Sequence, residues 1–228
     1  MVVTVIAWRA GLLTAMALVQ TVCARMDRRK FPCPGRMVNI ARSSATEVDA
    51  SRQREVRLHA KKLGAGSLPV VLEAGLATSS LNWSLLQPQV AAFATTLSYD
   101  RTGLGWSNSD GRRCSVGTIV EELHDLLHNM ELPAPYILVR HSFGGFVVRC
   151  YSQSYSDEVA GVVLVDPLGP EEWIAPTAAQ RRTLRLAART LRVIAALATL
   201  GVVRLCLLLA LREKRSTMGV RGNYSERA

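Results

Sequence analysis

The chain has 228 residues, of which 49% are hydrophobic and 20% are charged. This apolar fraction is ordinary for a globular protein and excludes wholesale disorder, and the length allows one large domain or two small ones. The net charge is +10 at pH 7, but the basic side chains concentrate in residues 1–62 and 176–228, whereas residues 63–175 carry an acidic excess. Nucleic-acid-binding proteins place basic charge on their folded module, so this distribution argues against nucleic acid as a partner.

Residues 1–24 are dominated by a long apolar run. We predict an N-terminal membrane anchor, with a signal peptide as the alternative and a buried helix of a soluble protein as a third interpretation. Four basic residues follow at once: Arg25, Arg28, Arg29 and Lys30. Because basic residues beside a span prefer the cytoplasmic side, they favour a retained anchor and a membrane-associated protein. Residues 25–35 then form a basic linker that contains two prolines.

Residues 36–175 are the predicted core domain, because apolar strand patterns alternate there with helical patterns. The predicted strands cover residues 55–63, 69–72, 96–99, 136–139 and 159–165, and the predicted helices cover residues 80–93, 116–130 and 143–154. The first strand alternates like an exposed one, whereas the last is almost continuously apolar, as in the buried middle of a parallel sheet. This alternation implies βαβ units, so we predict an α/β fold with a doubly wound, mostly parallel sheet.

Residues 176–228 are predicted to form a basic helical cap segment that ends in a polar tail. Five arginines recur at helical spacing among Leu and Ala: Arg181, Arg182, Arg185, Arg189 and Arg192. A basic amphipathic helix of this kind is typical of a membrane-surface or lipid-facing lid, and the core helix of an ordinary cap remains open beside it. The apolar run from Val193 to Leu211, interrupted by Arg204, has the length of a membrane span.

The cysteines and histidines of the chain show no metal-binding pattern. The five cysteines have no metal-type spacing and give no closed disulfide framework, so we interpret them as small buried hydrophobes. His124 and His128 lie four apart on a predicted helix, which can suit a metal, but no third ligand is near them in the sequence. A solvated or half-buried helix face is the preferred interpretation, and we expect neither a metal nor a cofactor. His59 is placed on the early exposed strand.

The segment from Tyr136 to Gly145 carries the strongest chemical signal. An apolar strand runs directly into Ser142, and a helix follows. A sharp turn between strand and helix exposes a serine hydroxyl near free backbone N–H groups, which a nucleophile requires. Gly144 and Gly145 allow the crowded backbone of such a turn. Arg140 stands two positions before the serine, where a small residue is usual, so its side chain must strain the turn or enter the packing behind it.

These residues resemble the nucleophile elbow of the α/β-hydrolase fold superfamily, with Arg140 in place of the first glycine. Three further segments are similar to that superfamily's motifs: Val70–Leu76, Ser98–Ser107 and Val163–Pro167. The resemblance covers roughly residues 36–175. It implies that Ser142 is the nucleophile and that the N–H groups of Leu76 and Phe143 form the oxyanion hole, with His141, Gly144 and Gly145 completing the elbow. The implied reaction is hydrolysis of an ester, amide or thioester through an acyl-enzyme.

The general base that the resemblance requires is missing from the sequence. The family's triad runs Ser, then Asp or Glu, then His, whereas all four histidines here lie at or before position 141. Asp166, after the sixth strand, is a weak candidate for the acid, and a structural role in an Asp-Pro turn is the preferred interpretation. His141 is a poor base, because neighbouring strand residues point to opposite faces. Asp100 and Arg101 are interpreted as a structural turn.

Two function hypotheses follow. In the first, the protein is a membrane-associated serine hydrolase of small, lipid-like acyl substrates, and the chain is truncated or frame-shifted before the last strands. In the second, it is a catalytically inactive, hydrolase-like binding or membrane protein. The α/β-hydrolase sheet would then be incomplete at its C-terminal end, and the exposed edge of its sixth strand would be open to pairing with another chain.

Overall fold

The computed structural model describes residues 2–40, 56–109, 111, 114–166 and 177–222. The chain separates into two compact units, one of residues 33–174 and one that combines residues 1–32 with residues 175–228. The first of these carries the sheet and is called the hydrolase unit below. The second consists of long helices and is called the helical unit.

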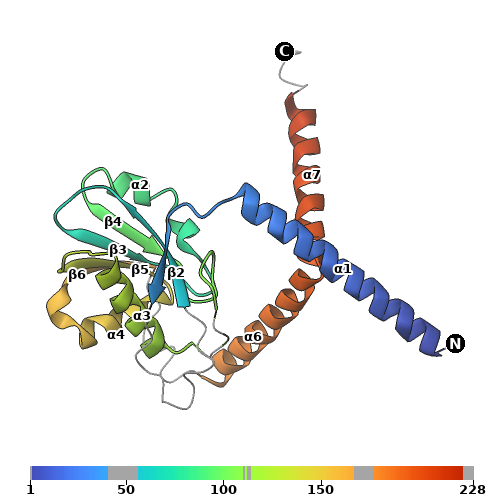
Figure 1. The fold of residues 1–228 in the computed structure, drawn as a ribbon, viewed down its shortest axis with the longest axis horizontal. Helices are drawn as coiled ribbons and strands as arrows, with labels where there is room; N and C mark the ends of the chain where they lie inside the picture. Colours follow the sequence, from blue (N-terminus) through green and yellow to red (C-terminus); the bar gives the residue numbers. More distant parts are fainter. Residues whose placement is uncertain (1, 41–55, 110, 112–113, 167–176, 223–228) are drawn as a thin grey trace. The chain divides into compact units, whose positions relative to one another are not determined.

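The hydrolase unit is built on a six-stranded sheet in the order β1-β2-β4-β3-β5-β6 (Figure 1). The strands are β1 (Arg36–Ile40), β2 (Val56–Leu63), β3 (Pro69–Glu73), β4 (Thr95–Tyr99), β5 (Tyr136–His141) and β6 (Val159–Val165). The first two pairings, β1 with β2 and β2 with β4, are antiparallel, and the other three are parallel. The five predicted strands and the mostly parallel sheet are therefore confirmed. The prediction missed β1, which has only five residues and no neighbouring predicted element in the sequence.

Helices cover both faces of this sheet. On one face lie α3 (Val116–Asn129) and α4 (Gly144–Ser154), and their buried side chains share a core with β1, β2, β4 and β5. On the other face, η2 (Ser80–Trp83) and α2 (Gln87–Val90) pack against β3 and β5 through a smaller cluster around Leu72 and Trp83. The prediction of one continuous helix over residues 80–93 is wrong, because the structure has two short helices there. Pro88 lacks an N–H and lies in the first turn of α2, where a helix can begin but cannot continue from before it.

Two predictions about exposure are wrong. His59 is fully buried, because the loop after β4 covers its side of β2: Asp100 Oδ2 lies 2.9 Å from His59 Nδ1, and the Trp106 ring lies 5.0 Å from the His59 ring. Conversely, β6 is the edge strand of the described sheet, and Val162, Val163 and Leu164 are exposed on it, although the continuous apolar run indicated a buried centre. The expectation that the sixth strand presents an open edge does match this arrangement within the described residues.

The cysteines are also less buried than expected. All five are free thiols: Cys23, Cys33 and Cys150 are half-buried, and Cys114 and Cys206 are exposed. Cys150 packs against the apolar core, but none of the five is fully buried, so the interpretation as small buried hydrophobes is wrong.

The helical unit contains α1 (Val2–Lys30), α6 (Ala178–Thr199) and α7 (Val202–Gly222). Residues 7–30 of α1 are long and apolar enough to cross a membrane, a test that signal sequences also pass. The run from Val193 to Leu211 is not one straight helix: α6 and α7 meet at a bend of 85°. Gly201 has a φ of +77° there, a backbone conformation that glycine adopts at little cost.

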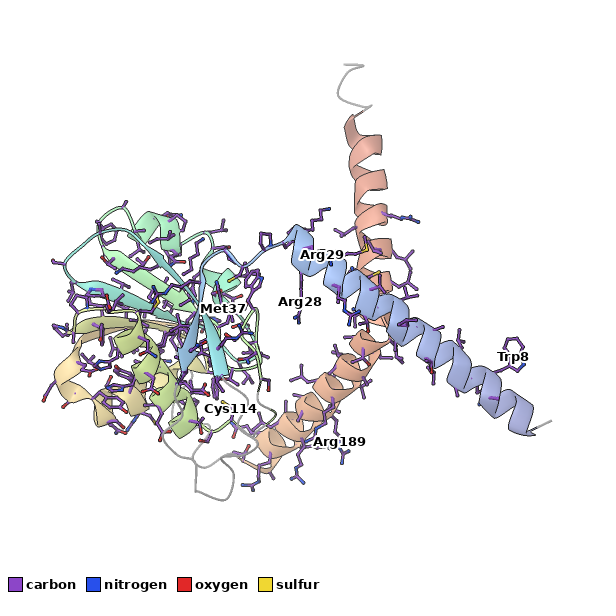
Figure 2. The ribbon with its side chains drawn as sticks, viewed as in Figure 1. Trp8, Arg28, Arg29, Met37, Cys114 and Arg189 are labelled. Carbon is purple, nitrogen blue, oxygen red and sulfur yellow. The ribbon has the colours of Figure 1, made fainter. Side chains whose placement is uncertain are left out.

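Side chains of α1 and α7 contact each other within the helical unit. Arg204 on α7 donates to the Gln20 amide oxygen at 2.9 Å and pairs with Asp27, both on α1. The arginine that interrupts the apolar run is therefore compensated by two polar groups. Most large apolar side chains of α1 remain exposed, and Trp8 extends from the helix with 79% of its surface accessible (Figure 2).

Candidate active site

Ser142 occupies a tight turn between β5 and α4. Its φ is +50°, a left-handed conformation that is uncommon for a residue with a side chain and that clusters at functional sites. The helix begins immediately, since the N–H of Gly145 donates to the Ser142 carbonyl oxygen at 3.0 Å. Within the described residues the Ser142 hydroxyl makes no hydrogen bond. The local geometry is that of the predicted elbow.

The large residue at the start of this turn is accommodated behind it. Arg140 is 9% exposed, and its guanidinium lies over Gly145, where an added Cβ would come within 2.4 Å of Nη1. That Nη1 has no hydrogen-bond partner among the described residues. The side chain borders a pocket of about 420 Å³ between α4 and β6, which Arg149 and Leu164 also line. Arg140 thus enters the packing behind the elbow, and the turn keeps its left-handed serine.

The loop after β3 lies against the elbow. A Cβ on Gly75 would lie 3.0 Å from His141 Nδ1 and 3.6 Å from the Ser142 Cβ, so the absence of a side chain there lets the His141 ring lie against this loop. Neither the Leu76 N–H nor the Phe143 N–H donates to a hydrogen bond within the described residues. An oxyanion hole requires free backbone donors, and these are the two N–H groups that the family resemblance implies.

A buried carboxylate anchors this loop. Glu73 ends β3 and is 1% exposed; it accepts hydrogen bonds from the Tyr99 hydroxyl and, at 2.7 Å, from Arg101 Nη1. The same guanidinium donates to the carbonyl oxygens of Ala74, at 3.1 Å, and Gly75, and it stands over the Phe143 ring. One arginine therefore contacts the end of β3, the loop after it (residues 74–76, called the oxyanion loop below) and the residue after the candidate nucleophile.

Burial sets the ionisation of this group. Burial raises the pKa of Glu73 to about 7, although the Arg101 charge and the two hydrogen bonds oppose the rise. Burial, followed by the charge of Glu73, raises the pKa of Tyr99 well above its ordinary value, so this phenol remains a donor. The role of Glu73 was not predicted from the sequence. Its signal was a single acidic residue that closes an otherwise apolar strand.

A second buried network holds the loop after β4. Asp100 accepts from the Ser80 N–H at 2.6 Å and the Trp106 N–H at 3.0 Å, and its Oδ2 lies 2.9 Å from His59 Nδ1. Burial alone would raise the pKa of Asp100, but the hydrogen bonds from His59, Ser80 and Trp106 outweigh it and lower the pKa. These contacts agree with the interpretation of Asp100 and Arg101 as structural residues. His59 faces this network and makes no described contact with Ser142.

Asp166 lies on the strand next to the nucleophile turn. In the parallel pairing of β5 with β6, His141 stands opposite Val165, so Ser142 and Asp166 are the next residue on each strand. Both have left-handed backbones, with φ values of +50° and +46°. Both residues therefore lie at the carboxyl ends of neighbouring parallel strands, and Asp166 is exposed there.

The fold is that of a known family. The sequence model of the alpha/beta hydrolase fold matches residues 69–201, and the chain belongs to that family. The match includes the oxyanion loop, the elbow and the sixth strand.

Individual relatives match only part of this chain. The uncharacterized protein YqjL of Bacillus subtilis is 31% identical over 104 residues, which are 46% of this chain and 41% of that protein. The human (lyso)-N-acylphosphatidylethanolamine lipase is 31% identical over 124 residues, 48% of this chain and 35% of the lipase. The chain thus spans less than half the length of these curated relatives.

Solved structures give the same result. A thermophilic esterase from Thermogutta terrifontis superimposes with a TM-score of 0.52 at 24% identity, over 60% of this chain and 49% of the esterase. A bromoperoxidase from Bacillus anthracis superimposes with a TM-score of 0.51 at 28% identity, over 59% of this chain and 45% of that enzyme. Both likenesses lie in the hydrolase fold.

Gly144 provides a test of the contact between α4 and the oxyanion loop. A Cβ there would lie 2.8 Å from Glu73 Cγ and 2.9 Å from the Ala74 carbonyl oxygen, so Gly144→Ala must push the helix away from the loop. We expect the free energy of unfolding to fall by about 1–3 kcal/mol. Gly117→Ala is the matched control, because that exposed helical glycine has room for a Cβ and the change should stabilise by up to about 1 kcal/mol. Equal effects of the two substitutions in urea unfolding would contradict the close approach.

Glu73 provides a test by pH. Its folded pKa of about 7 lies above the ordinary value of 4.5, so the folded state retains a proton that the unfolded state has lost. The stability of the wild-type protein should therefore fall as pH rises from about 4.5 to about 7, by an amount of the order of 3 kcal/mol, and level off above pH 7. Glu73→Gln should lack this fall, and the exposed Glu121→Gln control should keep it. Parallel curves for wild type and Glu73→Gln would show that burial does not shift this carboxyl group.

Proposed function

We propose that the chain carries the nucleophile half of a serine hydrolase that cleaves an ester or related acyl bond. The observation that supports this best is the left-handed Ser142 between β5 and α4, with two free N–H donors beside it. In the proposed reaction, Ser142 Oγ attacks the acyl carbonyl carbon, and the N–H groups of Leu76 and Phe143 stabilise the resulting oxyanion. The alcohol leaves with a proton, and water then releases the acid from the serine.

The proton of Ser142 needs a base, which these residues do not provide. None of the four histidines follows Ser142 in the sequence, and His59 is committed to Asp100. Asp166, one residue beyond β6, is the proposed candidate for the carboxylate that would orient a histidine supplied from elsewhere. A family member without that histidine would retain the fold and the anion-binding turn but would lose most of the catalytic acceleration.

A second candidate function rests on the unpartnered N–H groups at the elbow. In that case the protein is a catalytically inactive member of the family that binds an acyl ligand or a membrane. The same elbow would then hold a carbonyl or carboxylate oxygen on its N–H groups without a covalent step.

Covalent labelling separates the two candidates. Under the hydrolase proposal a fluorophosphonate probe labels the full chain and Ser142→Ala abolishes the label, because the probe reports an activated hydroxyl; under the second candidate function neither protein is labelled. Ser84→Ala is the control, since this exposed serine lies on the turn after η2. Absence of labelling in wild-type protein whose circular dichroism shows a folded α/β protein would favour the inactive binding protein. Labelling that survives in Ser142→Ala would contradict the assignment of the nucleophile.

We further propose that the protein acts at a membrane on a small, lipid-like acyl substrate. The support is the apolar α1, the basic residues Arg28, Arg29 and Lys30 at its end, and the exposed arginines of α6 such as Arg189 (Figure 2). Basic residues beside an apolar helix are attracted to anionic lipid. One relative, the human protein, is named as a phospholipid lipase. The open edge of β6 is proposed as a further contact surface for another chain.

Vesicle flotation tests the anchor. The full chain should float with phosphatidylcholine–phosphatidylserine vesicles, and Leu12→Glu combined with Leu18→Glu should prevent it, because each charge costs about 2.5–3.5 kcal/mol at the centre of a span. Leu85→Glu is the control: Leu85 is 83% exposed but belongs to the hydrolase unit. Flotation that survives the double substitution would contradict the anchor. A mature N-terminus near residue 24, measured by mass spectrometry, would instead identify a signal peptide.

A further inference from the structure

Three side chains meet at the amino end of β6. Ser142 lies at the opposite end of the parallel strands, after the carboxyl end of β5. His124 and His128 lie one turn apart on α3, and Glu158 is the last residue of η3 (Ser156–Glu158), directly before β6. The sequence showed the two histidines but no third ligand, because Glu158 is 30 or more residues away along the chain. The fold brings it between them.

The ligand atoms form a nearly equilateral triangle. His124 Nε2 and His128 Nε2 are 3.1 Å apart, and they lie 3.2 Å and 3.3 Å from the same carboxylate oxygen, Oε1 of Glu158. With metal–ligand distances of about 2.0–2.1 Å, two ligands lie roughly 3.3 Å apart in a tetrahedral site and roughly 3.0 Å apart in an octahedral one. The three measured separations fall between these values.

Hydrogen bonds satisfy at most two of the three contacts at once. If both Nε2 atoms are protonated, both N–H groups donate to Oε1, but the two donors then face each other at 3.1 Å. If one Nε2 is bare, it accepts from the other histidine or faces the lone pairs of Glu158, and one contact again lacks a proton. A divalent cation bound to all three atoms makes the arrangement favourable, because it accepts every lone pair.

The surrounding residues hold the ligands in place. The Tyr151 hydroxyl donates to Glu158 Oε2 at 2.6 Å, which leaves Oε1 free to face the histidines. The His124 ring stacks on Tyr155 at a centroid distance of 3.9 Å, and Asp125 Oδ1 lies 3.9 Å from its other nitrogen. The hydrogen bond to Glu158 and the stacking on Tyr155 therefore fix two of the three candidate ligands.

We propose that His124, His128 and Glu158 bind one divalent transition-metal ion of the Zn²⁺ class. Two imidazoles and one carboxylate suit Zn²⁺ better than Mg²⁺ or Ca²⁺, which prefer all-oxygen sites. His128 is 57% exposed, so water reaches the fourth position. The ion joins α3 to the segment that starts β6 and thereby fastens the exposed edge strand. This site is independent of the proposed hydrolase activity.

Metal titration of the full chain in detergent micelles tests the proposal. The probes are Zn²⁺, followed by calorimetry and by the melting temperature, and Co²⁺, followed by its visible absorption. The wild-type chain, with its five thiols alkylated, should bind one ion per chain, and saturating Zn²⁺ should raise the melting temperature by about 4 °C or more. His128→Ala and Glu158→Gln should each weaken binding by about 100-fold or more and remove the thermal shift.

The control is Asp157→Asn, which removes the exposed carboxylate next to Glu158 and should bind like the wild type. His128→Ala changes an exposed side chain, so its far-ultraviolet circular dichroism should match the wild type. Absence of one-to-one binding by the wild type would overturn the site. Binding of wild-type strength in either His128→Ala or Glu158→Gln would do the same, because the proposed site needs all three ligands.

Discussion

The arrangement around Ser142 depends on one buried ion pair, that of Glu73 with Arg101. A carboxylate that ends a buried strand is costly unless charge and hydrogen bonds compensate it, and Arg101 supplies both. Because the same guanidinium also holds the carbonyl groups of Ala74 and Gly75, the compensation fixes the loop that would bind the oxyanion. Strand end, loop and elbow are therefore held by a single side chain.

The sequence predicts the parts of this fold that depend on local pattern. The strand and helix alternation was readable because β3 and β5 are mostly apolar and α3 and α4 each have one apolar face. The serine turn was readable because an apolar strand, a serine and two glycines follow one another directly. The break between η2 and α2 shows the limit of such predictions. The apolar residues keep helical spacing through residues 80–93, but the backbone forms two separate short helices.

Features that depend on long-range pairing were not readable. Burial of His59 follows from the loop after β4, whose Asp100, 41 residues away in sequence, contacts the His59 ring. The role of Glu73 follows from Arg101, which is 28 residues away in sequence. The convergence of Glu158 on two histidines is of the same kind. In each case a polar residue takes its function from a neighbour that only the folded sheet provides.

The central claim is that Glu73 and Arg101 depend on each other, and a double-mutant cycle measures this most directly. Urea unfolding at pH 8 would be followed for wild type, Arg101→Met, Glu73→Gln and the double variant. The account predicts that Arg101→Met alone is the least stable, by about 3 kcal/mol or more relative to wild type, since it leaves a buried charge without a partner. Adding Glu73→Gln should then restore stability, with a coupling energy above about 1 kcal/mol. Additive effects of the two substitutions would contradict the account.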